Sequence, residues 1–165
     1  MKNIHTTLLF LTKNDEVLLA MKKVRFGAGW WNGIGGKGEP GESIEQALVR
    51  ECQEEISVTP LSWHKAAELD FILDANTTPW HMYVHAFLVD EWQGEPCESE
   101  EMAPEWFKKD TLPYDQMWPA DNEWIPLILK GDKVAGDFVF NEGNRLVSHN
   151  IKTVKLLPSL HEWRV

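Results

Sequence analysis

The stretch that decides the fold is residues 36–58, which read GKGEPGESIEQALVRECQEEISV. Its first part closes a long glycine-rich segment, residues 25–42, which holds seven of the eleven glycines and predicts a structured loop. The remainder predicts a helix from Ser43 to Ile56, because Ser43 is followed three residues later by Gln46 in a capping-box pattern. A structured loop therefore leads directly into a capped helix.

This helix carries acids where a core-facing helix normally carries apolar side chains. At about 100° per residue, Glu51 and Glu55 continue the apolar stripe that begins at Ile44, and Glu54 lies at its edge. Like charges at this spacing repel by roughly 0.2–0.5 kcal/mol per pair, and partial burial adds to the cost. A divalent cation removes that cost, and oxygen-only ligands favour magnesium, manganese or calcium over zinc. The alternative is a solvated acidic face paired with Arg50, which the alignment with the apolar stripe disfavours.

The segments on both sides of this helix predict a mixed α/β layered domain that spans residues 1–165. A second helix is expected within Asp121–Lys130, after Pro119. Strands are expected at 4–12, 16–21, 61–73, 80–90, 105–108, 133–140 and 145–155.

Composition limits where the protein works and what it binds. The net charge of −10 argues against binding of long nucleic acid. A single nucleotide can still bind if metal ions neutralise its phosphates. The only cysteines, Cys52 and Cys97, form no disulfide framework and suit a reducing compartment. The early apolar run Leu8–Leu11 is too short for a signal peptide. We expect a cytoplasmic monomer with no membrane association.

The loop and helix together resemble the Nudix box of the Nudix hydrolase superfamily. The glycine and charged positions of that motif are occupied by Gly36, Glu42, Arg50, Glu51, Glu54 and Glu55. Two positions depart from it. Cys52 replaces a larger aliphatic residue, and Ser57 replaces a glycine that often ends such a helix in the left-handed conformation.

The resemblance extends to MKKVRFGAGWWNGIGGK (21–37), CESEEMAPEWF (97–107) and MWPADNEWIPLIL (117–129). These stretches are similar to the oxidised-purine nucleoside triphosphatases of that superfamily, the mammalian-type MutT homologues. The resemblance implies a Nudix α/β/α sandwich with a mixed sheet between helices. It also implies magnesium-dependent hydrolysis, with manganese as a substitute, of a damaged purine triphosphate such as 8-oxo-dGTP to its monophosphate and diphosphate.

Site residues carry over from the resemblance by position. Metal binding is implied for the Gly35 carbonyl, Glu51, Glu54, Glu55 and Glu101. Arg50 matches an arginine that orients a box glutamate, and either Glu55 or Glu101 is expected to accept the proton of the attacking water. Substrate binding is implied for Thr7, Lys22, Phe26, Asn32, Gly36, Lys37, Phe71, Met82, Trp118 and Asp121.

The implied purine pocket has chemistry that can be judged residue by residue. Trp118 can stack on a base, Asp121 can accept two N–H bonds from guanine, and Asn32 offers a donor and an acceptor. Without the resemblance, packing for the tryptophan and helix capping for the aspartate would be the preferred interpretations. Ala120 stands where the family has a second aspartate, so we expect retained use of oxo-guanine, weaker use of oxidised adenine and tolerance of 6-methylated purines.

Other functions stay open at this stage. A Nudix activity on ADP-ribose or dinucleoside polyphosphates is disfavoured by the match at 117–129, whereas alkylated purine nucleotides remain possible substrates. A catalytically silent nucleotide-binding module is disfavoured by the intact glutamates. A P-loop is excluded because no Lys-Ser or Lys-Thr pair follows the glycines.

Overall fold

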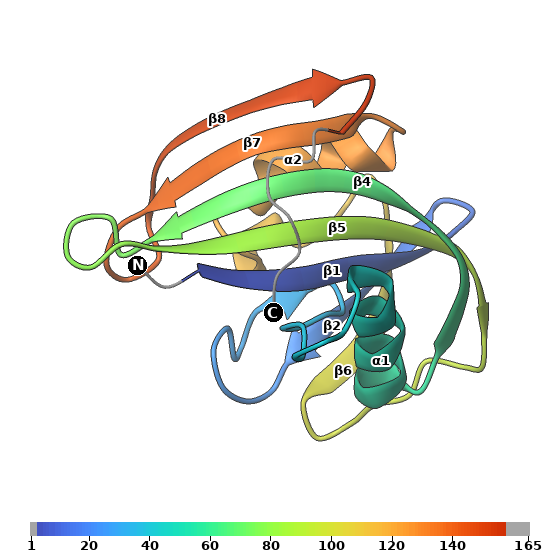
Figure 1. Ribbon diagram of the computed structural model, residues 1–165. Coiled ribbons are helices and arrows are strands. Elements are labelled where there is room, and N and C mark those ends of the chain that lie inside the picture. Colours follow the sequence, from blue (N-terminus) through green and yellow to red (C-terminus); the bar gives the residue numbers. More distant parts are fainter. Residues whose placement is uncertain (1–2, 158–165) are drawn as a thin grey trace.

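The computed structural model describes residues 3–157, which form a single mixed α/β unit (Figure 1). In chain order the elements are β1 (Asn3–Lys13), β2 (Glu16–Lys22), β3 (Trp31–Asn32), α1 (Ile44–Ile56), β4 (Thr59–Leu73), β5 (Trp80–Gln93), β6 (Met102–Lys108), η1 (Tyr114–Gln116), α2 (Asp121–Leu129), β7 (Lys133–Phe140) and β8 (Leu146–Val154). Within residues 3–157, no helix combines the length and apolar character needed to cross a membrane.

The strands join in one mixed sheet, as predicted. The strand order in the sheet is β3-β2-β1-β5-β4-β7-β8. In addition, β6 pairs with β2. The pairs β1–β5 and β4–β7 are parallel, and the remaining neighbours are antiparallel. The sheet is therefore buried on both faces near its centre, where the parallel pairs lie.

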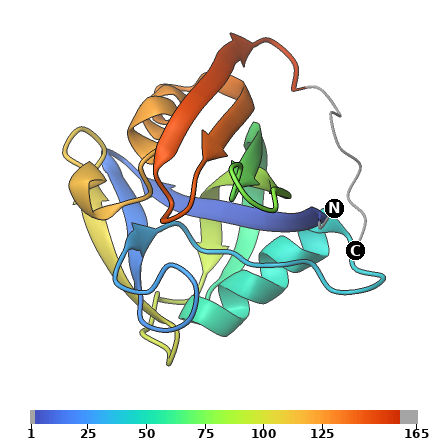
Figure 2. The ribbon, with the colours of Figure 1, turned by 90° about the vertical axis from the view of Figure 1, so that its left-hand side faces the viewer.

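Two separate hydrophobic cores lie on the two faces of this sheet. Strand β1 contributes to both because successive side chains point to opposite faces: Leu9 and Leu11 pack with α1, whereas Phe10 packs with α2. Trp124 of α2 is fully buried and meets the ring of Phe10 edge-on, with centroids 6.1 Å apart. Figure 2 shows the two helices on opposite sides of β1. The predicted α/β/α sandwich is confirmed.

Helix α1 begins and ends as its sequence predicts. The Gln46 backbone N–H donates to Ser43 Oγ at 3.1 Å, and the Ser43 N–H donates to Gln46 Oε1 at 2.8 Å, which completes the capping box. At the other end Ser57 takes the left-handed conformation, with φ 60° and ψ 32°. The residue that replaces the family's glycine thus adopts the backbone shape that favours glycine.

The sheet splits between β1 and β2, and this split creates the site. The two strands pair only beside their hairpin turn, at Thr12↔Val17 and Lys13↔Glu16. Farther along, the glycine-rich segment lies against β1 instead: Leu9 N–H donates to the Ile34 carbonyl at 2.6 Å. Strand β2 is held away from β1 there, and the parted residues line the cavities described below.

The structure differs from the predicted elements mainly at the sheet edge. Strand β3 was not predicted, and β6 begins at Met102 instead of at residue 105. Both pair with β2, through Ala20↔Asn32 and Lys22↔Met102. Pairing with a distant strand leaves no local periodicity in such short segments, so the sequence alone did not show it.

Replacing Ser57 with glycine tests the helix end. Ser57→Gly removes the strain of a left-handed residue with a Cβ and should raise the free energy of unfolding by about 0.5–1 kcal/mol. Gln53→Gly, inside the same helix, is the control and should lower it by about 1 kcal/mol. Urea denaturation measures both, and a destabilised Ser57→Gly protein would contradict the assigned cap.

Candidate active site

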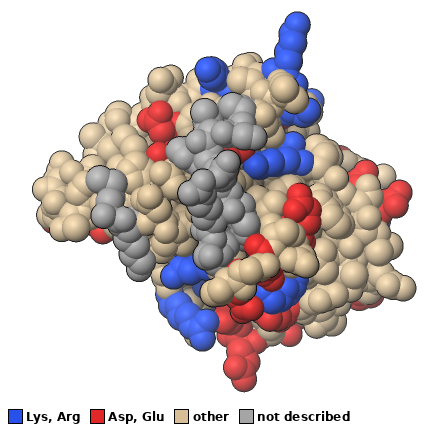
Figure 3. All heavy atoms as spheres, viewed as in Figure 1, with Lys and Arg blue, Asp and Glu red and all other residues tan. Residues whose placement is uncertain are grey.

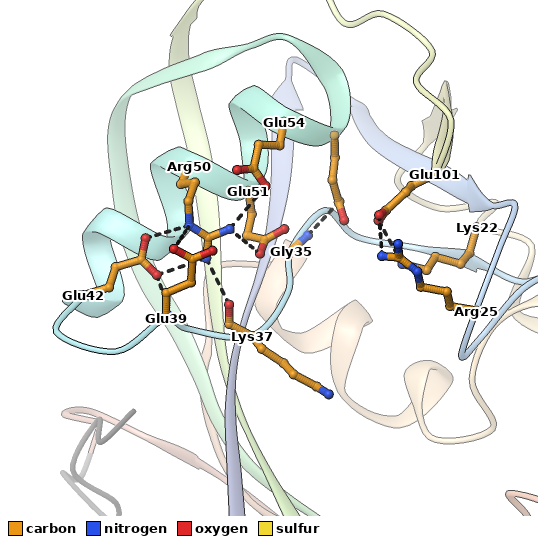
Figure 4. Close-up of polar contacts among 11 residues, drawn as sticks. Lys22, Arg25, Gly35, Lys37, Glu39, Glu42, Arg50, Glu51, Glu54 and Glu101 are labelled. Carbon is orange, nitrogen blue, oxygen red and sulfur yellow. Dashed lines mark hydrogen bonds and ion pairs between the residues drawn. The ribbon is translucent and has the colours of Figure 1, made fainter.

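Arg50 of α1 is the centre of an acidic cluster. Its Nε and Nη2 donate to the two oxygens of Glu42 at 2.7 and 3.0 Å, and its Nη1 donates to Glu51 at 2.8 Å and to Glu54 at 3.3 Å. Nη2 also donates to the Lys37 carbonyl at 3.0 Å. Figure 4 shows the guanidinium pointing into this group of acids from α1 and the preceding loop. Arg50, the predicted orienting arginine, thus binds three box glutamates at once.

Glu55 is the most buried acid of the cluster, with 4% of its surface exposed. Burial, reinforced by the charge of Glu51, raises the pKa of Glu55 to about 8. Burial also raises the pKa of Glu51, although its bond from Arg50 opposes the shift. Two neighbouring carboxyl groups are thus held where negative charge is unfavourable unless a cation enters.

The glycine segment approaches both β1 and α1 too closely for any side chain. A Cβ at Gly35 would overlap the Thr7 carbonyl oxygen, and one at Gly36 would lie 2.6 Å from the Glu51 carboxylate. This approach brings the Gly35 N–H to Glu55 Oε2 at 3.2 Å. Main chain and carboxylate therefore meet where the Gly35 carbonyl was predicted to bind metal.

A further acid, Glu101, faces the cluster from the segment before β6. It pairs with Arg25 through Nη1 and Oε1 at 2.7 Å, and with Lys22 Nζ at 3.6 Å. Figure 4 shows Glu101 turned toward these two cations, across Gly35 from Arg50. The predicted metal-binding acids thus line a single cleft of about 820 Å³ from opposite walls.

The predicted metal ligands in this cleft fit a hard divalent cation, because the four acids Glu51, Glu54, Glu55 and Glu101 and the Gly35 carbonyl supply oxygen. In the described part of the chain, however, no three His, Cys, Asp or Glu side chains stand close enough together to share one ion. Arg50 holds Glu51 and Glu54, and Arg25 holds Glu101. Acidic side chains also gather near α1 in the surface view of Figure 3, with basic ones beside them.

A smaller, mostly apolar cavity of about 130 Å³ adjoins the cleft. It brings together nine of the predicted substrate residues: Thr7, Lys22, Phe26, Asn32, Gly36, Phe71, Met82, Trp118 and Asp121. The tenth, Lys37, lines the acidic cleft. Lys22, Phe26 and Met82 line both spaces, so the cavity opens directly into the cleft.

Aromatic rings form the outer wall of this cavity. Trp118 contacts Phe26, with ring centroids 5.2 Å apart, and meets Trp30 edge-on at 5.1 Å. Only 6% of Trp118 is exposed, whereas Phe26 is 55% exposed at the mouth. Packing and pocket lining were alternative interpretations of Trp118. The residue does both, because it packs against neighbouring rings and also lines the cavity.

Two buried polar atoms in the cavity wall have no partner: Thr7 Oγ1 and Asp121 Oδ2. The other Asp121 oxygen accepts from Trp124 Nε1 at 3.2 Å. Burial raises the pKa of Asp121 to about 7. Ala120 is fully buried in the core on the α2 side and does not line the cavity, so Asp121 is the acid of this pocket.

Sequence reasoning missed part of both spaces. Thr6, Leu8, Val84 and Met102 line the cavity without having been predicted. Arg25, Glu39, Ser99 and Glu100 line the cleft likewise. Thr6 and Leu8 could have been found from β1, where both share a face with Phe10. Val84 of β5 and Met102 of β6 depend on strand pairing, and the cleft residues depend on how distant loops meet.

The NUDIX domain profile matches residues 1–128. The chain belongs to the Nudix family. The oxidized purine nucleoside triphosphate hydrolases of Danio rerio and Mus musculus are 43% and 40% identical to it over 149 and 148 residues, each match covering 90% of this chain and 94% of the relative. The crystal structure of a MutT protein from Bacillus halodurans has a TM-score of 0.78 at 28% identity, covering 90% of this Nudix chain and 97% of the other.

The buried Asp121 makes a prediction about stability and pH. Because its pKa is about 7 in the folded protein and 3.8 when free, ionisation opposes folding as the pH rises from about 4 to about 7. Asp121→Asn abolishes this titration. Relative to wild type, the variant should therefore gain stability across that window, by up to about 4 kcal/mol, and gain nothing more above it.

Urea denaturation at several pH values measures the difference between variant and wild type, in which the other carboxylates cancel. Asp115→Asn is the control, because Asp115 lies on the surface six residues earlier. An Asp121→Asn difference that stays constant between pH 5 and pH 8 would show that Asp121 ionises normally.

Proposed function

We propose that this Nudix protein hydrolyses the triphosphates of oxidised purine nucleosides, such as 8-oxo-dGTP, to the monophosphate and diphosphate, and that it uses Mg²⁺. One observation carries the proposal. An aromatic cavity opens directly into a cleft lined by acids. The cavity wall holds the buried carboxyl group of Asp121, one oxygen of which has no hydrogen-bond partner. A base held in the cavity extends its phosphates into that cleft.

The relatives support the same chemistry. The two animal proteins are named for hydrolysis of oxidized purine nucleoside triphosphates, and each match covers nearly the whole of both chains. Each match covers 90% of this chain, and the residues that line the cavity and the cleft are spread from Thr6 to Asp121, so the similarity includes most of the base pocket as well as the acidic helix. A general Nudix activity on unrelated diphosphates would need only the acidic helix and not the base pocket.

The acids would hold the metal together with the Gly35 carbonyl. When bound, Mg²⁺ neutralises the phosphates and acidifies the attacking water. Arg50 keeps Glu51 and Glu54 extended toward the cleft, and the Gly35 N–H fixes one oxygen of Glu55. Lys22, at the junction of the two spaces, is placed to meet the phosphate nearest the sugar.

Glu55 is the better placed of the two candidate proton acceptors. Glu101 is paired with Arg25 at 2.7 Å and with Lys22 at 3.6 Å, so its two oxygens are already engaged by cations. Glu55 has a single main-chain donor, Gly35, and lies deeper in the cleft. We therefore assign the proton of the attacking water to Glu55.

Recognition of the base rests on Asp121 and Asn32. With a pKa of about 7, Asp121 is present in both forms near neutral pH; the ionised form accepts from guanine N1–H and N2–H. Asn32 turns its Oδ1 toward the Gly33 N–H at 2.9 Å, which leaves its amide N–H groups to donate to a purine carbonyl. A guanine edge suits this pair better than an adenine edge, which has no N1–H.

Steady-state kinetics with normal, oxidised and methylated purine triphosphates tests the proposal. We expect magnesium-dependent diphosphate release and a higher kcat/KM for 8-oxo-dGTP than for dGTP or 2-oxo-dATP. Highest activity on a 6-methylated purine would favour the alkylated-nucleotide alternative. Binding without turnover would show a silent nucleotide-binding module.

Glu54→Gln tests the metal site within the same assay. Removing one metal-binding charge should lower kcat by about two orders of magnitude or more, while thermal stability holds because repulsion with Glu51 falls. Glu45→Gln is the matched control, since it removes an exposed charge from the first turn of the same helix. Turnover near that of wild type in Glu54→Gln would exclude Glu54 as a metal ligand.

A further inference from the structure

Arg25 occupies a position in the acidic cleft that the mechanism above does not use. Its guanidinium lines the cleft, and 75% of the side chain is exposed. Phe26, the next residue, lines both the cavity and the cleft, whereas Arg25 lines the cleft alone. Arg25 therefore lies on the phosphate side of the site.

Within residues 3–157, four cationic side chains line this cleft: Lys22, Arg25, Lys37 and Arg50. Arg50 is committed to Glu42, Glu51, Glu54 and the Lys37 carbonyl. Arg25, by contrast, contacts Glu101 through Nη1, and most of its planar fork faces solvent. A guanidinium fork of this kind matches the oxygens of a phosphate group.

The backbone holds Arg25 in place at a cost. Its φ of 65° is left-handed, a conformation that is unfavourable for a residue with a Cβ. The surrounding turn is nevertheless closed on both sides: Ala28 N–H donates to the Arg25 carbonyl at 3.1 Å, and Gly29 N–H donates to the Lys22 carbonyl at 2.8 Å. The neighbouring Lys23 N–H donates to the Glu101 carbonyl at 2.8 Å. The loop thus presents the arginine beside Glu101 in spite of the strain.

We propose that Arg25 binds the outer phosphates of the substrate and so distinguishes the triphosphate from the monophosphate product. The Glu101 carboxylate cannot bind Arg25 and a metal ion equally well, so Glu101 would release the guanidinium if it bound Mg²⁺. The freed fork then takes the phosphate oxygens that the nucleotide brings into the cleft. Arg25 is thus assigned as a substrate-binding residue. This inference rests on the proposed function, since it requires a triphosphate in the cleft.

Arg25→Gly separates this role from a structural one, because glycine removes the guanidinium and also relieves the left-handed strain. The variant should melt at or above the wild-type temperature. Calorimetric titration in magnesium buffer compares two probes, the non-hydrolysable α,β-imido analogue of 8-oxo-dGTP and 8-oxo-dGMP. We expect the variant to lose about tenfold or more in affinity for the triphosphate analogue and little for the monophosphate.

Lys23→Ala is the matched control. It removes a cation from the same loop, one that pairs with Glu98 at 2.7 Å and does not line the cleft, so both affinities should stay at wild-type values. The proposal is overturned if Arg25→Gly binds the triphosphate analogue as wild type does, or if it loses both probes equally. If the wild-type protein binds neither probe, the proposed function falls as well.

Discussion

The close approach of the segment Gly33–Gly36 to β1 is the constraint on which the site depends. Its backbone bonds to Leu9 and Thr7 fill the gap where β2 has left β1, and a Cβ at Gly35 would overlap the Thr7 carbonyl oxygen, so this position requires glycine. The same residues touch the acids of α1, because the Gly35 N–H reaches Glu55 and Gly36 lies against Glu51. The split sheet, the base cavity and the acidic helix are thus joined through one short stretch of backbone.

Electrostatics explains how the protein holds so many acids together. Arg50 places one delocalised positive charge among Glu42, Glu51 and Glu54, and its bonds to Glu42 lower the pKa of that carboxyl group. Burial, reinforced by the charge of Glu51, raises the pKa of Glu55 to about 8, so this carboxyl group takes up a proton near neutral pH when no metal ion is bound. The cluster is therefore tolerated without metal, and a divalent ion would offset the remaining cost of burying the charges of Glu51 and Glu55.

The sequence predicted whatever depended on local pattern. The capping box at Ser43, the strand at residues 4–12 and the acidic stripe of α1 are each visible within a few residues, and the structure confirms all three. Strand β3 and the early start of β6 were not predicted, because both segments become strands only through pairing with β2. The nine residues of the cavity were named from resemblance, and the structure brings them together. Arg25 could not be found this way, since its place in the cleft depends on a left-handed turn and a distant glutamate.

Substitutions in the base cavity and in the phosphate cleft differ in how much they affect the stability of the fold. Trp118 and Asp121 form the wall of the base cavity but are also buried against the core, where Trp118 meets Phe140 and Asp121 bonds to Trp124. A substitution at either residue that changes which base is recognised therefore also changes the packing that stabilises α2. On the phosphate side, Arg25 projects from a loop and is mostly exposed, so its replacement leaves the core intact. If Trp118 and Asp121 read the base and Arg25 binds the outer phosphates, as proposed, base choice is tied to the stability of this protein, whereas binding of the outer phosphates can change almost independently of it.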